Sequence, residues 1–91
     1  KVQHLKDVIY LLNAHNIPIT GITEKVSDTV YKNNFKGPTA LVFGSEDIGI
    51  SKGILKILTN QVKLPMSENI DSLNVSVACG VVLYEVIRQR I

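Results

Sequence analysis

The sequence predicts an α/β domain built on a parallel sheet. Apolar residues recur at helical spacing near the start and the end of the chain, and three short apolar runs lie between them. Strands that alternate with helices in this way are typical of a parallel sheet. With 91 residues and 45% hydrophobic content, the chain is large enough for one core but not for two.

The first half of the chain supplies one helix and two strands. An apolar stripe from Val2 to Leu12 predicts an amphipathic helix, which residues 13–16 end. Residues 17–22 form an extended run rich in β-branched side chains, the first predicted strand. We expect a loop with one helical turn at 23–36. The uniformly apolar run 39–43 then predicts a strand that is covered on both faces.

The second half supplies a short helix, a third strand and a long terminal helix. Ser51 can cap a helix over residues 52–58, because its hydroxyl can accept an unpaired amide hydrogen bond. Residues 62–64 form the third predicted strand, which a proline ends. The last helix is expected to start at Ser72 or Leu73 and to run to about residue 90.

The terminal helix is apolar almost all round between Val75 and Ile87. A helix of this kind is buried on every side, so we expect one face to meet the sheet and the other a second subunit. Gly80 would cost roughly 1 kcal/mol against alanine in a helix interior. We therefore expect it to allow the close approach of another backbone.

Two polar turns follow strands and predict a binding site. Residues 44–50 leave the second strand and contain Glu46 and Asp47, while residues 66–71 leave the third. In parallel sheets the ligand crevice lies beyond the carboxyl ends of the strands. Both turns are therefore expected to form the walls of one site. Glycine at position 44 permits a sharp turn and lets a ligand reach the main chain.

Each turn also has a purely structural explanation. Residues 44–50 fit an ordinary strand-to-helix turn with acidic residues, and Ser72 or Asp71 fits a helix cap. Capping accounts for one of the polar residues at 71, 72, 74 and 76 but not for all four. That surplus favours a functional role for the second turn.

Composition excludes several classes of protein. The net charge of +2 argues against a strongly basic nucleic-acid module. Cys79 is the only cysteine, so no disulfide framework or cysteine metal pair is expected, and neither His4 nor His15 has a metal-ligand partner at useful spacing. No apolar run approaches the roughly 18 residues of a membrane span. We expect a cytoplasmic protein without a metal.

Together the two turns resemble those of a known family. LVFGSEDIGIS and LPMSENIDSLNVSVACGVVLYEVIRQR are similar to the second and third motifs of the SpoU/TrmH group of SPOUT RNA methyltransferases. The resemblance covers essentially the whole chain, and its SLNVSVA segment is specific. Among subgroups, the chain looks most like the 23S ribosomal RNA guanosine-2′-O-methyltransferases of the RlmB type.

The resemblance implies a fold and a cofactor. The fold would have helices on both faces of the parallel sheet and a C-terminal trefoil knot, and the cofactor would be S-adenosyl-L-methionine. The family's cofactor contacts fall by position on Gly44, Leu64 and Leu73. Met66 and Asn74 would complete the pocket together with Ser72.

The resemblance also implies a reaction, the transfer of a methyl group to a ribose 2′-OH of RNA, with ribosomal RNA as the expected partner. Glu46, Ser72 and Asn74 match the catalytic positions of the two motifs. The first motif, with its asparagine and arginine, has no counterpart in these residues. We therefore expect residues 1–91 to be the C-terminal part of one SPOUT methyltransferase domain, and a homodimer to form through the C-terminal helix.

Two other functions are compatible with the sequence. One is a cofactor-binding or RNA-binding module that retains the crevice but does not transfer methyl groups. The other is a flavodoxin-like domain that binds a different small ligand at the same edge. Affinity for S-adenosylhomocysteine argues against the second, and methyl transfer argues against both.

Overall fold

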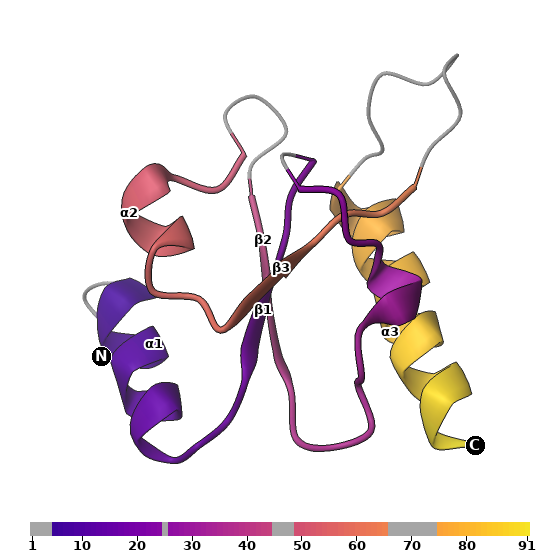
Figure 1. The fold of residues 1–91 in the computed structure, drawn as a ribbon, viewed down its shortest axis with the longest axis horizontal. Helices are drawn as coiled ribbons and strands as arrows, with labels where there is room; N and C mark the ends of the chain where they lie inside the picture. Colours follow the sequence, from indigo (N-terminus) through magenta and orange to yellow (C-terminus); the bar gives the residue numbers. More distant parts are fainter. Residues whose placement is uncertain (1–4, 25, 45–48, 66–74) are drawn as a thin grey trace.

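The computed structural model describes residues 5–24, 26–44, 49–65 and 75–91 (Figure 1). It confirms the predicted α/β fold with a parallel sheet. The elements are, in chain order, α1 (Leu5–Ala14), β1 (Ile19–Ile22), the single 3₁₀ turn η1 (Val30–Lys32), β2 (Ala40–Phe43), α2 (Lys52–Leu55), β3 (Asn60–Val62) and α3 (Val75–Arg90). Within these ranges, no helix is long and apolar enough to cross a membrane.

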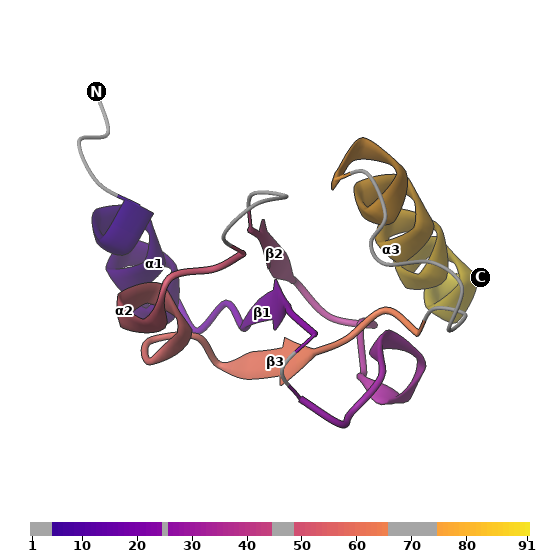
Figure 2. The same cartoon turned by 90° about the horizontal axis from the view of Figure 1, so that it is seen from above.

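The three described strands form one sheet in the order β2-β1-β3, and both pairings are parallel. Helices cover the two faces of this sheet. Seen from above, α1 and α2 lie on one side, and η1 and α3 lie on the other (Figure 2). The sheet thus lies between two layers of helix, which is the usual arrangement for a parallel sheet.

The core lies mainly between the sheet and α3. Its buried cluster consists of Val30, Phe35, Val62, Val82 and Val86. On the opposite face of the sheet, the side chain of Leu58 packs against Gly21 of β1. A Cβ at position 21 would overlap it. Glycine at this position therefore lets the segment after α2 pack directly onto the sheet.

Local chemistry explains where α2 begins and where α1 ends. The Ser51 hydroxyl accepts a hydrogen bond from the Ile54 amide at 3.4 Å, which confirms the predicted cap of α2. α1 ends at Ala14, within the segment that the sequence marks as a stop. Asn16 follows with φ of 59°, a left-handed conformation that asparagine tolerates better than most residues.

The structure differs from the sequence predictions in four elements. β1 begins at Ile19 rather than at residue 17. β2 was expected to be covered on both faces, but residues 40–43 are all half-buried. The reason is its position, since β2 is an edge strand of the described sheet. β3 lies two residues earlier than predicted, and α2 ends at Leu55 rather than at residue 58. The predicted start of the last helix lies outside the described residues.

A buried carboxylate lies in the second half of α3. Glu85 is 4% exposed and accepts hydrogen bonds from Arg88 Nε at 2.7 Å and Arg88 Nη2 at 2.8 Å. Gln89 Nε2 donates a third hydrogen bond to Glu85 Oε2, at 2.8 Å. These donors, Arg88 first and Gln89 second, lower the pKa of Glu85 from 4.5 to about 2. The carboxylate is therefore held in its charged form.

The same turn of α3 is attached to the segment that precedes β2. Gln89 Oε1 accepts from the Phe35 amide at 2.7 Å, and Gln89 Nε2 donates to the Asn33 carbonyl at 2.9 Å. Arg90 donates to the carbonyls of Phe35 and Gly37, at 2.9 and 2.6 Å. These bonds satisfy backbone groups that no strand or helix pairs, and they fix the end of α3 against the sheet.

We predict that Glu85 makes stability depend on acid pH. Its folded pKa lies below that of the unfolded chain, so its contribution is complete above about pH 4.5 and is lost as the pH falls towards about 2. Replacing it by Glu85→Gln should flatten the fall of the melting temperature across that window. Thermal melts of both proteins measure this, with Glu24→Gln, an exposed carboxylate, as control. Equal slopes for Glu85→Gln and the unsubstituted protein would contradict the prediction.

Candidate functional site

The carboxyl ends of the three strands meet at one edge of the sheet. Ile22 ends β1 and pairs with Phe43, the last residue of β2, and with Val62, the last residue of β3. The chain leaves all three strands at the upper edge in Figure 1. Ligands of parallel α/β sheets bind beyond this edge. The two turns that the sequence marks thus begin at the same edge, as predicted.

The two expected cofactor contacts that the structure describes lie on either side of β1. Gly44 directly follows β2, and Leu64 lies two residues beyond β3. Because β1 separates β2 from β3, these strands are about 10 Å apart, which is twice the spacing of neighbouring strands. The edge between them can therefore be spanned by a small molecule.

Gly44 is required by the turn itself. A Cβ at this position would overlap the backbone of Gly49 and the amide of Ile50. Gly49 has φ of +76°, a conformation that favours glycine. The chain therefore returns against β2 before α2 starts, and the main chain of Gly44 is held close to the edge of the sheet.

Leu64 joins the candidate site to the core. It is half-buried and packs against the buried cluster beneath α3, together with Ile22 and Phe43. All three side chains end or follow a strand at the same edge. The edge of the sheet is therefore apolar on the side of the core.

The other expected site residues lie outside the described residues. These are Glu46, Met66, Ser72, Leu73 and Asn74. Residues 44 and 49 flank the segment that holds Glu46 and lie against each other, while residues 65 and 75 flank the segment that holds the other four. The proposed roles of these five side chains remain predictions from the resemblance.

The resemblance places the adenosine portion of S-adenosylmethionine at this edge. A flat base needs apolar surface on its faces and main-chain donors and acceptors at its rim, and Leu64 and the backbone at Gly44 can offer these. These contacts to a base do not require a metal. Across the described ranges, no group of three or more His, Cys, Asp or Glu side chains gathers as a metal site would.

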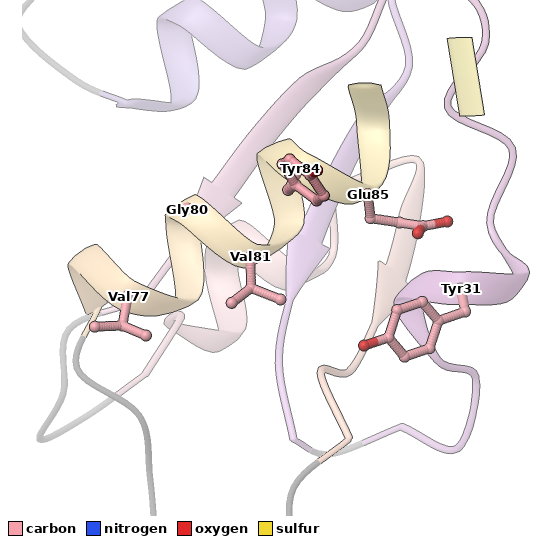
Figure 3. A pocket seen from close by; sticks show the side chains of 6 residues that line it. All are labelled: Tyr31, Val77, Gly80, Val81, Tyr84 and Glu85. Carbon is pink, nitrogen blue, oxygen red and sulfur yellow. The ribbon is translucent and has the colours of Figure 1, made fainter. Parts of the chain in front are cut away.

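A groove lies along α3. The sequence predicted the apolar face that lines it but not the groove itself. The groove has a volume of about 440 Å³ and is lined by Tyr31, Val77, Gly80, Val81, Tyr84 and Glu85 (Figure 3). The predicted close approach of a backbone to Gly80 is not made by the described chain, because nothing lies within 4 Å of an added Cβ. The sequence signal for the groove is the apolar spacing at 77, 81 and 84, together with the glycine.

The comparisons with known proteins agree with this arrangement. The model of the SpoU rRNA Methylase family matches residues 1–84. The chain is 39% identical over 90 residues to the 23S rRNA (guanosine-2′-O-)-methyltransferase RlmB of Yersinia pestis. It is 32% identical, also over 90 residues, to a tRNA/rRNA methyltransferase of Synechocystis whose function is uncharacterised. The alignments cover 99% of this chain but only 37% and 33% of those two proteins.

Solved structures show the same fold. A structure of an RNA 2′-O ribose methyltransferase superposes with a TM-score of 0.88 and 33% identity, over 97% of this chain and 34% of that one. The SpoU methyltransferase AviRb of Streptomyces viridochromogenes, in complex with the cofactor AdoMet, gives 0.88 at 30% identity, over 98% of this chain and 36% of that one. The chain thus spans little more than a third of these relatives.

The fold and the two motif-bearing turns define an α/β protein with a ligand edge at the carboxyl ends of its strands. The match of the family model over residues 1–84 makes the assignment specific. The chain belongs to the SpoU rRNA Methylase family.

We predict that Gly44→Ala destabilises the protein, because the added methyl group would overlap the backbone at residues 49 and 50. Overpacking of this kind costs about 1–3 kcal/mol. Urea unfolding measures the loss. Gly37→Ala is the matched control, since nothing lies within 4 Å of a Cβ at that position. Equal stability of the two variants would show that the turn can open without cost.

Proposed function

We propose that the protein transfers a methyl group from S-adenosylmethionine to a ribose 2′-OH of ribosomal RNA. The observation that carries this proposal is the convergence of the two family motifs at one edge of the sheet, where Gly44 and Leu64 flank β1. The AdoMet complex of AviRb, a SpoU methyltransferase with the same fold, supports the choice of cofactor. The RlmB relatives support ribosomal RNA as the substrate.

Each site residue has a proposed role. Gly44 and Leu64 hold the adenosine through the main chain and an apolar wall, and Met66 and Leu73 extend that wall. Asn74, with Ser72, orients the cofactor or the nucleotide, while Glu46 orients a cationic group. These roles follow from the motif positions and from the chemistry of the side chains.

The chemistry sets what the protein must supply. The cofactor provides a methyl group on a positively charged sulfur. The 2′-oxygen must lie about 3 Å from the methyl carbon, in line with the bond that breaks, so positioning accounts for much of the rate. The hydroxyl is a poor nucleophile at neutral pH and needs a base or a charge-stabilising cation. We assign this activation to an arginine of the first motif, which residues 1–91 do not contain.

We predict that Asn74→Ala removes methyl transfer with little effect on folding. Turnover is measured in the full-length protein by the transfer of a labelled methyl group to ribosomal RNA, and folding by thermal melts. Asn60→Ala is the matched control, because Asn60 is exposed on β3, away from the carboxyl edge. Calorimetric titration of both variants and of the unsubstituted protein with S-adenosylhomocysteine measures cofactor binding.

The outcomes separate the candidate functions. Cofactor binding with no turnover in the unsubstituted protein would favour a binding module over an enzyme. No affinity for S-adenosylhomocysteine would contradict the cofactor assignment. Full turnover of the Asn74→Ala variant would remove Asn74 from the catalytic set but leave the function standing.

The proposal includes a homodimer through α3. Several apolar side chains of this helix are exposed in the single chain, at Val77, Val81, Leu83, Tyr84 and Ile87. Tyr84 is 73% exposed, an unusual position for a large aromatic side chain within an apolar helix. Gly80 leaves the groove open for the close approach of a second helix. A second copy would bury this surface.

The trefoil knot and a cytoplasmic location are parts of the same proposal. In the proposed knot, the final segment of the chain, which holds α3, would thread through the loop that precedes it. Family membership and a TM-score of 0.88 to SpoU methyltransferases support it.

We predict that Tyr84→Lys weakens the dimer, because it places a charge in the apolar groove. Sedimentation of the full-length protein measures the dissociation constant, which should rise by at least tenfold, about 1.4 kcal/mol. Tyr10→Lys on α1 is the control, since Tyr10 is also exposed, at 56%. A monomeric unsubstituted protein would contradict the dimer. An unchanged dissociation constant would place the interface elsewhere.

A further inference from the structure

Three lysines gather on the side of the sheet that lies opposite α3. Lys6 belongs to α1, Lys52 to α2, and Lys56 follows α2 directly. All three are exposed. The two helices lie side by side in both views (Figures 1 and 2). These three residues are called the lysine patch below.

The contacts place the three lysines on neighbouring parts of one surface. The Lys56 amide donates to the Lys52 carbonyl at 3.2 Å, so these two residues lie one helical turn apart and on the same face. Lys6 Nζ lies 3.3 Å from the position that a Cβ would take at Gly53, the residue after Lys52. The glycine therefore leaves the space in which Lys6 reaches across α2.

The patch is not neutralised by the described part of the chain. The ion pair found there joins Arg88 to Glu85, and neither residue is near α1 or α2 in sequence. Asp7 is the acidic residue within the described parts of the two helices, against three lysines.

We propose that the lysine patch binds backbone phosphates of the RNA substrate. This inference rests on the proposed function, which makes RNA the partner, and adds a second contact surface outside the candidate site. Lysine ammonium groups bind phosphates as point charges, without reading the base sequence. The patch therefore contributes affinity and orientation rather than the choice of nucleotide.

The test is the salt dependence of RNA binding. Each phosphate contact adds about 0.7 to 0.9 to the slope of log K against log salt concentration. A variant of the full-length protein with Lys52→Gln and Lys56→Gln should therefore lose about 1.4 to 1.8 from this slope. Fluorescence anisotropy with a labelled ribosomal RNA hairpin, between about 50 and 200 mM salt, gives the value. Adding Lys6→Gln should lower the slope further.

A matched control separates local contacts from net charge. Lys32→Gln with Lys36→Gln removes the same charge from two exposed lysines, also four residues apart, on the other side of the sheet. The proposal expects an unchanged slope for this pair, and unchanged affinity of both variants for S-adenosylhomocysteine. Equal losses in the two pairs, or no loss in either, would overturn the lysine patch but not the proposed function. An unsubstituted protein that does not bind RNA would overturn both.

Discussion

The rest of the structure depends on the parallel pairing of β1 with both of its neighbours. β1 is the central strand of the described sheet, and Ile22 at its end faces the last residue of β2 and of β3. A slip of one residue would reverse the faces of the strand. Thr20 or Ile22 would then stand where Gly21 leaves room for Leu58. Packing on both faces thus selects the register that brings the two turns to one edge.

The end of α3 adds a second constraint to this sheet. Gln89 and Arg90 connect the last turn of α3 to residues 33–37, which lead into β2, and Glu85 accepts a hydrogen bond from Gln89 within the helix. One segment of the candidate site follows β2, and the other precedes α3. The hydrogen bonds at the far ends of these two elements therefore hold together the pieces that carry the site. A carboxylate that stays charged suits this task, because hydrogen bonds to charged groups are stronger than those between neutral ones.

The sequence predicted those features that depend on local patterns. The apolar stripe of the first helix, the Ser51 cap and the helix stop at residues 13–16 are each determined within a few residues. The edge position of β2 could not be predicted, because an apolar run looks the same in the centre and at the edge of a sheet. β3 was placed too late because Asn60 and Gln61 are polar, although they pair with Thr20 and Gly21.

Contacts between residues far apart in the chain could not be predicted from local sequence patterns either. The spacing of Glu85 and Arg88 is visible, but nothing near them indicates that Gln89 reaches a backbone amide 54 residues away. The convergence of the two turns was predictable because parallel strands have only one carboxyl edge. The two described contacts, Gly44 and Leu64, lie at that edge, while the resemblance alone supplies the roles of the other site residues.

α3 connects the two surfaces that the proposed function needs. The helix begins directly after residues 66–74, which hold four of the predicted site residues, and its exposed apolar face starts within its first turn at Val77. Val82 and Val86 on the opposite face are buried in the core. A second subunit along the exposed face would therefore fix the helix from both sides. The start of α3 would then have little freedom, so dimer formation and the order of the cofactor site would be coupled through a single helix.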